Sequence, residues 1–389
     1  MSPVRPAPQP ARTRYPDRTT YPARITSPHD PRPPHDPIAT RAARPIAARP
    51  GITSPPHVPA SRHGITSRKV SKVASAHPSP AAPATHGQPW PLGLGVIDTM
   101  VGLPQDPAAL YRQIRSVLRD KESREDFVMP ASYMFHDVPT AHEAQDADPV
   151  ALVLGEMDRH GLDVALISLS ANTEVAQRAL TEHPGRFVAS WTCDPNQGMA
   201  GLRTLVRMHE EWGVRAVSLF PHGVSPQVAI DAPQMYPIYA KCVELEIPVF
   251  VSVGIAGPRV PSMVQRVELI DQVMYDFPEL VFVMRHGAEP WTDLAVKLML
   301  KWPNLYYSTS AFSPRYYPAN IIDYANTRGA DKIIYGGYFP MGLSLDRIMT
   351  ELAQVPLKAE VWPKFLRHNA ARVLGLGDID LGDIDRKTP

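Results

Sequence analysis

From residue 93 onward, short apolar runs alternate with longer stretches of mixed polarity. Eight of the runs are rich in Val, Ile, Phe and Tyr, and several are continuously apolar, as in strands that are buried on both faces. The expected strands are 96–99, 163–169, 186–193, 214–220, 247–253, 280–286, 305–310 and 332–337.

The stretches between these runs carry apolar residues at helical spacing. The clearest face repeats at i, i+3, i+4 and i+7 and consists of Leu345, Ile348, Met349 and Leu352. Two further faces are Leu202, Leu205, Val206 and Trp212, and Val264, Val267, Ile270, Met274 and Phe277.

Eight strand–helix units in residues 93–376 predict a (β/α)8 TIM barrel, which typically takes ~250 residues. A doubly wound open sheet is the alternative, but eight sequential units favour closure. The segment 100–162, between the first two strands, is a long insertion that contains DFVMPASYMFHDVP. We expect it to form a lid or a subunit contact over the barrel mouth.

Residues 1–92 differ in composition from this body. Residues 1–90 hold 20 prolines and 13 Lys/Arg against 3 Asp, a charge of +10, so that the rest of the chain carries −9. Such a segment cannot form a core, and we expect it to be disordered. It reads as an inert tail or a misplaced start, as a basic arm for nucleic acid or acidic partners, or as a targeting segment. A second tail is expected at 377–389.

The chain shows no sign of membrane insertion or of disulfide chemistry. No apolar run reaches the length of a membrane span, and no signal-peptide core precedes the body. Cys193 and Cys242 have no short-spaced metal partner, so we expect reduced cysteines in a cytoplasmic protein.

In a barrel of this kind, chemistry takes place at the C-terminal ends of the strands. Of the eight histidines in the body, only His222 and His286 lie at or just past an expected strand end. The other residues expected there are Met100, Gly102, Ser170, Asn172, Cys193, Asp194, Ser252, Gly254, Arg285, Glu289, Ser310 and Tyr338.

A series of motifs along residues 93–376 resembles the amidohydrolase-related family of the amidohydrolase superfamily. The motifs are VIDT at 96, HPGRFVASWTCDPNQ at 183, WGVRAVSLFPHG at 212, MYPIYAKCVELEIPVFVSVG at 235, FPELVFVMRHGAEPW at 277, KWPNLYYSTS at 301, ADKIIYGGYFPMG at 330 and HNAARVLGL at 368. The resemblance implies a (β/α)8 hydrolase or decarboxylase, in which a divalent metal activates water or binds the substrate.

The same resemblance assigns five positions to metal ligands, and this chain has changed most of them. The first-strand histidines fall on Met100 and Gly102, the strand-five histidine on Ser252, and the strand-eight aspartate on Tyr338. The strand-six histidine is kept as His286. Since Gly offers no ligand atom and the Met thioether suits zinc poorly, we expect no tight metal or other cofactor. The alternative is a weakly bound divalent metal such as Zn near His286.

Each candidate side chain has a functional and a structural interpretation. His286 is the leading proton-transfer residue, with Arg285 and Glu289 as substrate-binding neighbours; the alternative is a histidine that only holds a loop. His222 and Tyr338 are further candidates for contact with substrate.

The remaining two candidates are favoured for structural roles. Asp98 orients loops or reaches substrate. Ser252 fills a vacated ligand position or binds substrate, since no G-x-S-x-G elbow marks it as a nucleophile.

Two functions follow from these residues. One is an amidohydrolase-like hydrolase or carboxy-lyase that acts on a small carboxylated or acyl substrate without the usual metal. The other is a non-catalytic barrel that serves as a ligand-binding or partner subunit. We further expect a homo-oligomer, a dimer by family habit, with no membrane partner and no nucleic acid beyond the basic arm.

Overall fold

The computed structural model describes residues 89–91, 93–104, 115, 117–126, 148–170, 173–340 and 342–377. The expected N-terminal extension, the C-terminal tail and almost all of DFVMPASYMFHDVP lie outside the described residues.

Eight parallel strands form one sheet in sequence order, β1 to β8. The strands are β1 (Val96–Asp98), β2 (Leu162–Ser168), β3 (Phe187–Thr192), β4 (Ala216–Leu219), β5 (Val249–Ser252), β6 (Phe282–Arg285), β7 (Leu305–Ser308) and β8 (Ile333–Ile334). Each lies within its predicted run or one residue from it. The sequential order excludes the doubly wound alternative, whose strand order reverses at a switch point.

Hydrogen bonds between the residues that follow β8 and β1 bring the two ends of the sheet together. The backbone of Thr99 donates to Tyr335, that of Tyr338 to Met100, and that of Gly102 to Phe339, over 3.4, 3.0 and 2.7 Å. The TIM-barrel-like fold expected from the sequence is thus confirmed. The strands are short, and backbone hydrogen bonds between the loops that follow β8 and β1 join the two edges of the sheet at the C-terminal end of the barrel, which is the barrel mouth.

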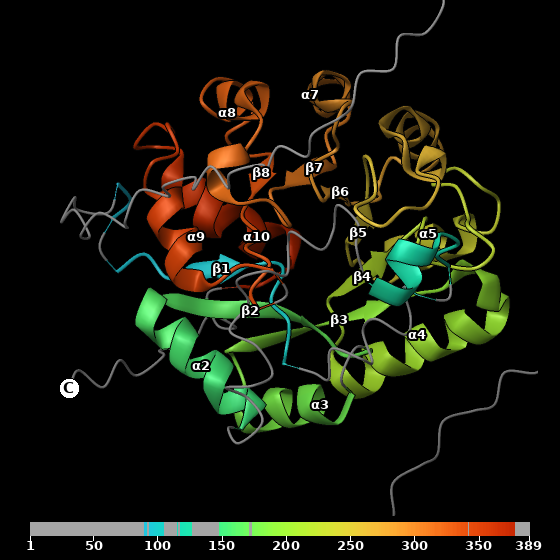
Figure 1. Cartoon of the computed structure of the whole chain (residues 1–389), viewed down its shortest axis with the longest axis horizontal. Coiled ribbons are helices and arrows are strands. Elements are labelled where there is room, and N and C mark those ends of the chain that lie inside the picture. The colour runs from blue at the N-terminus through green and yellow to red at the C-terminus, as the bar shows by residue number, and fades with distance from the viewer. Residues whose placement is uncertain are drawn as a thin grey trace, which may run out of the picture. The chain divides into compact units, whose positions relative to one another are not determined.

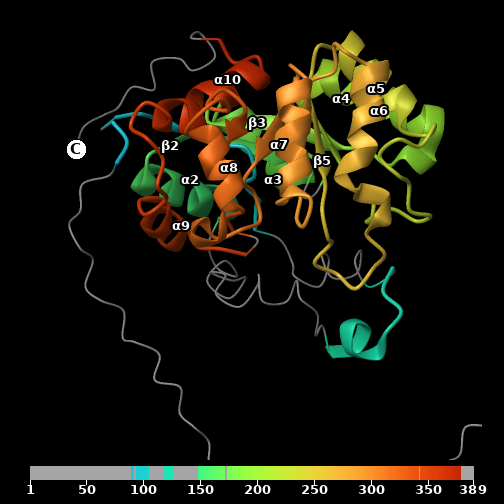
Figure 2. The same cartoon turned by 90° about the horizontal axis from the view of Figure 1, so that it is seen from above.

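Helices cover the strands from outside (Figures 1 and 2). The α-helices are α2 (Pro149–His160), α3 (Thr173–Glu182), α4 (Gly198–Trp212), α5 (Tyr236–Glu244), α6 (Ile270–Asp276), α7 (Thr292–Lys301), α8 (Ala319–Ala325), α9 (Leu345–Leu352) and α10 (Asn369–Val373). The 3-10 and π turns are η1 (Glu122–Asp126), η3 (Pro195–Gln197), η4 (Met263–Gln265), η5 (Val267–Leu269), η6 (Pro314–Tyr316) and η7 (Lys364–His368). The face predicted for α9 is fully buried. The stretch predicted around Val264 to Phe277 is divided instead, because Arg266 is extended (φ −69°, ψ 142°).

The continuous apolar runs arise because both faces of each strand are buried. On β5 and β6, Phe250 and Val283 belong to the barrel interior, whereas Val251 and Met284 pack in the larger layer between strands and helices. Burying an aliphatic or aromatic side chain contributes about 1.5–3 kcal/mol, so these runs stabilise the fold from two sides at once.

The last helix closes the N-terminal end of the barrel. Ala370, Val373 and Leu374 join the interior cluster, and the buried Asn369 donates to the carbonyls of Ala330 and Ile333 just before and within β8. This end of the barrel is a packed plug, which leaves the opposite end, where the strands finish, for chemistry.

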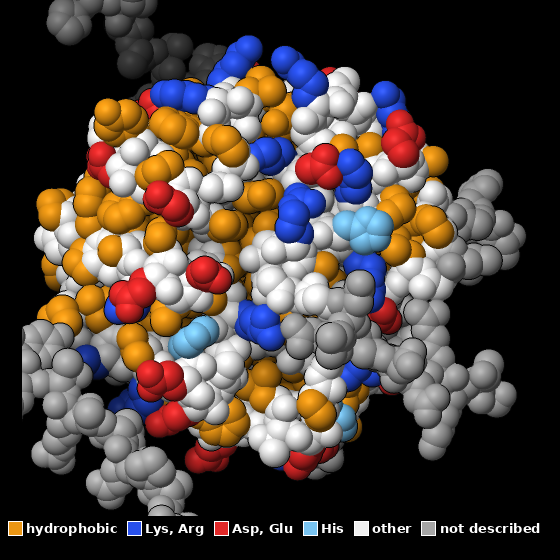
Figure 3. Space-filling view, turned by 180° about the vertical axis from the view of Figure 1, so that it is seen from behind, with side chains coloured by type: hydrophobic (Ala, Val, Ile, Leu, Met, Phe, Trp, Pro, Cys, Tyr) orange, Lys and Arg blue, Asp and Glu red, His pale blue; other side chains and the backbone are white. Residues whose placement is uncertain are grey.

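The helices and the two cysteines of the described part of the chain bear on the expectations for membrane insertion and disulfide chemistry. None of the helices in the described part of the chain is long and apolar enough to cross a membrane. On the face drawn in Figure 3, basic and acidic side chains are interspersed among hydrophobic ones. Cys193 and Cys242 are free thiols in the core, as expected.

Candidate functional site

Arg285 is a cation inside the barrel. It ends β6 opposite Ser252 of β5. Because side chains alternate along a strand, it shares the inward face of Val283, which lies two residues earlier in the interior cluster. Only 3% of Arg285 is exposed. The side chain therefore lies above the apolar interior, at the mouth.

The guanidinium of Arg285 is only partly satisfied. Its Nη1 donates to Ser218 Oγ over 3.3 Å and contacts Met100 Sδ at 3.6 Å, and its face lies 4.6 Å from the ring centre of Phe220. Nε and Nη2 are buried and have no hydrogen-bond partner among the residues that the structure describes. Burial lowers the pKa of Arg285 to about 10, so the group remains charged at neutral pH.

His286 follows directly and turns out of the strand. Its backbone has φ of 68°, a left-handed conformation that is rare for a residue with a Cβ. The ring stacks at 6.2 Å on Phe220 and stands edge-on to Tyr338 at 5.7 Å, and its Nδ1 lies 3.3 Å from Ser310 Oγ. Burial, then the charge of Arg285, holds the pKa of His286 well below its usual range. The imidazole is therefore neutral at pH 7.

His222, after β4, is a second neutral imidazole whose tautomer is fixed. Gln265 Nε2 donates to the carbonyl of Gly254 over 2.8 Å, so the amide oxygen faces His222 Nδ1. Nδ1 must then carry the proton, which leaves Nε2 as a lone-pair acceptor. Burial lowers the pKa of His222, and the charge of Arg285 lowers it further. The sequence analysis missed Gln265, which sets this tautomer.

Tyr338 completes the aromatic wall beside His286. It is half-buried with φ of 90°, and its backbone donates to Met100 across the junction of β8 and β1. Burial raises the pKa of its phenol, so the hydroxyl stays protonated and can donate a hydrogen bond but cannot act as a base near pH 7.

Asp98 fixes loops rather than facing the cationic group. Its Oδ1 accepts the backbone N–H groups of Met100 and Gly337, both at 2.9 Å, and so ties the end of β1 to the end of β8. A Cβ at position 337 would lie 2.4 Å from Asp98 Oδ2, which explains the glycine there. Burial raises the pKa of Asp98 to about 6. The structural interpretation of this residue fits the geometry better than substrate binding.

The two other predicted binding residues, Ser252 and Glu289, have different surroundings. Ser252 is 1% exposed and is paired with Arg285 in the strand register, and its Oγ has no hydrogen-bond partner within the described ranges. Glu289 is exposed, and none of the described contacts joins its carboxylate to Arg285 or His286. The structure thus gathers Arg285, His286, His222, Ser252 and Tyr338 and leaves Glu289 aside.

Backbone strain concentrates at the same end of the barrel. Four of the five described non-glycine residues with positive φ follow β6, β7 or β8, namely His286, Ala288, Ala311 and Tyr338. Such conformations cost about 1–3 kcal/mol each and persist where the surroundings impose them. Strain stored at a strand-end mouth is typical of a functional site.

Two members of the site escaped the sequence analysis. Ser218 and Phe220 orient Arg285, yet both lie in a run that reads only as a buried strand. One signal in the sequence was the polar Ser218 within an apolar strand. Side chains alternate along a strand, so Ser218 shares the inward face of Ala216, which lies in the barrel interior.

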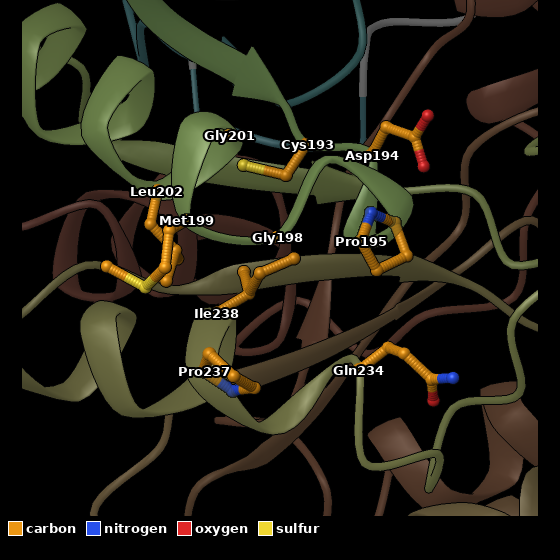
Figure 4. A pocket seen from close by; sticks show the side chains of 10 residues that line it. All are labelled: Cys193, Asp194, Pro195, Gly198, Met199, Gly201, Leu202, Gln234, Pro237 and Ile238. Atoms are coloured by element: carbon orange, nitrogen blue, oxygen red, sulfur yellow. The ribbon is translucent and has the colours of Figure 1, made fainter.

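A cavity of about 150 Å³ lies just after β3, where α4 and α5 begin, and its lining residues include none of those gathered around Arg285 (Figure 4). It is lined mainly by apolar groups, including Pro195, Leu202 and Ile238. Cys193 borders it, but burial raises the pKa of this thiol to about 12, so it is no nucleophile at neutral pH.

Three residues between α2 and α9 have the donors of a metal site. Glu156, His160 and Asp346 each offer one ligand atom, and these atoms lie within 4.8 Å of one another. Two carboxylates and an imidazole suit a divalent cation. Arg159, however, already bridges Glu156 and Asp346 as a counter-cation. The i, i+4 spacing of Glu156 and His160 was visible in the sequence, but Asp346 joins them only through helix packing.

Comparison with solved structures places this fold among known barrels. An uncharacterized TIM-barrel protein from Bordetella bronchiseptica is 22% identical, over 72% of this chain and 98% of that one, with a TM-score of 0.55. The 5-carboxyvanillate decarboxylase of Sphingomonas paucimobilis is 16% identical over 73% and 100%, with a TM-score of 0.51. That of Novosphingobium aromaticivorans, solved with bound manganese, is 16% identical over 72% and 97%, with a TM-score of 0.52. At these identities the likeness concerns the fold alone.

Comparison of the sequence with family models identifies the family. None of the curated proteins matches the chain. The family model described as amidohydrolase, by contrast, matches residues 76–376, well over half of the chain and the whole barrel. The chain therefore belongs to the amidohydrolase family.

Proposed function

We propose that this chain is a hydrolase or carboxy-lyase that acts on a small carboxylated or acyl substrate without the family's usual tight metal. The observation that carries the proposal is the group at the mouth: a buried, partly unsatisfied guanidinium beside two neutral imidazoles. A cation can hold or polarise an oxyanion, and a neutral imidazole can take up a proton, so the group supplies both parts of such a reaction.

The donor set at the mouth does not fit a divalent metal. Of the five positions that the family resemblance assigns to ligands, Gly102 has no donor atom, Met100 offers a thioether, and Tyr338 keeps its proton. The charge of Arg285 stands against Met100 Sδ and opposes a second cation there. The proposed reaction therefore uses no metal at this place.

His286 is the leading proton-transfer residue. Its pKa lies well below the usual range, so the neutral form persists throughout the neutral pH range and the protonated form gives up its proton readily. Ser310 Oγ and the ring of Phe220 hold the imidazole in place. His222, with Nε2 as acceptor, is the second base at the same mouth.

The test is a turnover screen of the full chain against small esters, lactones and carboxylic acids, with acid release and CO2 as readouts. We expect His286→Asn to lower kcat about 100-fold or more, within the usual range for losing a general acid or base. His183→Asn, in a loop before β3, is the matched control and should leave kcat unchanged. EDTA should have no effect. Activity that survives His286→Asn, or that EDTA removes and Mn²⁺ restores, would contradict the proposal.

A non-catalytic, ligand-binding barrel is the second candidate. It is favoured by the strand-eight position, where the family's acid is replaced by the protonated phenol of Tyr338. Saturable binding of a ligand at the mouth, with no turnover in the same screen, would support this function instead.

A further inference from the structure

The side chain of Arg285 is held in one orientation. Ser218 Oγ and Met100 Sδ hold Nη1, and Phe220 lies against the flat face of the guanidinium. An arginine pinned at one nitrogen and one face has little freedom to turn. Its remaining atoms therefore point in a defined direction.

The atoms left over form one edge of the guanidinium. Nε and Nη2 carry two parallel N–H bonds on the same side, which is the side-on fork that matches the two oxygens of a carboxylate. Both are buried, and both lack a partner among the described residues. An unpaired buried charge is costly, so a protein that keeps one has a use for it.

A second unpaired donor lies next to this fork. Ser252 ends β5 directly opposite Arg285 in the strand register, and its buried Oγ likewise has no partner in the described part of the chain. Two orphaned donors on neighbouring strands indicate a common acceptor. The rings of Phe220, His286 and Tyr338 stand around the same place.

We propose that the Nε–Nη2 edge of Arg285, with Ser252 Oγ, anchors one carboxylate of a small molecule, and that this guanidinium is the permanent cation of the mouth. Met100 and Ser252, two positions assigned to metal ligands by family resemblance, border it. The arginine thus supplies positive charge where relatives would bind a metal. The inference rests on the proposed function only for the idea that the ligand enters this mouth.

The test is direct binding to the full-length protein, by calorimetry or ligand-observed NMR, with acetate, benzoate, benzamide and inorganic phosphate as probes. Benzoate and benzamide have nearly the same shape, so the pair isolates the charge. We expect benzoate to bind and benzamide to bind about tenfold more weakly or not at all. Phosphate, a bulkier tetrahedral anion, should not displace benzoate.

The variants isolate the fork. Arg285→Met should weaken benzoate binding about 10- to 100-fold, as for a lost charged hydrogen-bond pair. Arg285→Lys keeps the charge without the fork and should still lose about tenfold. Ser252→Ala should lose a few-fold. Arg203→Met, at an exposed position of α4, is the matched control and should bind as the native chain does. Thermal unfolding of each variant checks that it folds.

The inference is wrong if neither acetate nor benzoate binds, if Arg285→Met binds benzoate normally, or if phosphate alone binds. Arg285-dependent binding without any turnover would sink the proposed function and leave the anchor standing. Turnover that Arg285→Met does not impair would do the reverse.

Discussion

Two arginines at opposite ends of the same barrel have opposite surroundings. Arg367, in η7 at the N-terminal end, forms an ion pair with Asp163 at 2.9 Å and donates to the carbonyl of Gly95 at 2.7 Å. Arg285, at the C-terminal end, is more deeply buried and has no carboxylate partner among the described residues. The first is an internal clasp that joins η7 to the starts of β1 and β2. In the second, Arg285, two guanidinium nitrogens have no hydrogen-bond partner among the described residues.

The two aspartates repeat this contrast. Asp163 lies with Arg367 at the N-terminal end of the barrel, the paired end. Among the described residues, Asp98 at the mouth has no cationic partner, and its Oδ1 accepts two backbone N–H groups instead. The ion pair of Arg367 and Asp163 compensates two charges at the first end, whereas Arg285, Ser252 and Asp98 at the mouth keep buried polar atoms that have no hydrogen-bond partner among the described residues. Proteins commonly accept such a cost at ligand sites, because the unsatisfied groups are the ones that meet the ligand.

The largest expected effect concerns Asp98 and pH. Burial raises the pKa of Asp98 in the folded protein from its ordinary value of 3.8 to about 6, so ionisation is disfavoured there. The penalty is fully present above pH 6 and vanishes below about pH 4, and a shift of this size corresponds to about 3 kcal/mol. Relative to Asp98→Asn, the native chain should therefore gain stability as pH falls from 8 towards 4.

Urea unfolding of both proteins at several pH values measures this difference. Asn keeps an acceptor for Met100 and Gly337, so the variant should fold. Asp271→Asn is the control, because the hydrogen bond from Lys301 lowers the pKa of Asp271, and the native chain should lose stability relative to this variant as pH falls. A difference for Asp98→Asn that is flat across pH 4 to 8 would show that the carboxylate ionises as easily in the folded state as in the unfolded chain.

The second largest effect concerns the ion pair between Arg367 and Asp163 at the paired end. Arg367→Met leaves Asp163 without its partner in a region where both side chains are 18% exposed. Breaking a fully buried pair costs 3–5 kcal/mol, and partial exposure reduces this to about 2 kcal/mol. The measurement is the urea midpoint at pH 7. Lys364→Met, in the same turn, breaks the exposed pair with Asp331 and should change stability by less than about 0.5 kcal/mol. Equal effects of the two variants would mean that the clasp is no more than a surface pair.

The paired end and the mouth also differ in how well the sequence predicted them. All eight strands were placed because burial on both faces imposes continuous apolar runs, and α9 because its buried face repeats at helical spacing. The N-terminal plug was not predicted, since the contacts of Asn369 with Ala330 and Ile333 join segments that are distant along the chain. β8 is shorter than expected because Gly336 and Gly337 leave the ladder and pass close to Thr99 and Asp98.

At the mouth, the sequence identified several of the site residues but not the contacts between them. Strand ends sufficed to identify Arg285, His286 and Tyr338. The sequence could not show that His286 leaves the strand at positive φ, so that Arg285 instead stands level with Ser252. Nor could it show that the exposed Glu289 gives Arg285 no counter-charge. Those facts depend on backbone direction and on side-chain contacts across strands.

The smallest expected effect is a gain in stability, whereas Arg367→Met is expected to lose stability. Arg285→Met removes a buried charge that has no carboxylate partner, and a thioether side chain can keep the contact with Phe220. Replacing such a charge by an apolar side chain is commonly neutral or stabilising, and the loss of one 3.3 Å hydrogen bond to Ser218 offsets part of the gain. We expect the ligand-free variant to gain about 1 kcal/mol at pH 7, measured by the same urea midpoint. The gain should disappear when benzoate saturates the native chain, because binding stabilises only the protein that keeps the fork. A loss of stability in the ligand-free variant, similar to that of Arg367→Met, would mean that both arginines are structural clasps and that the two ends of the barrel do not differ.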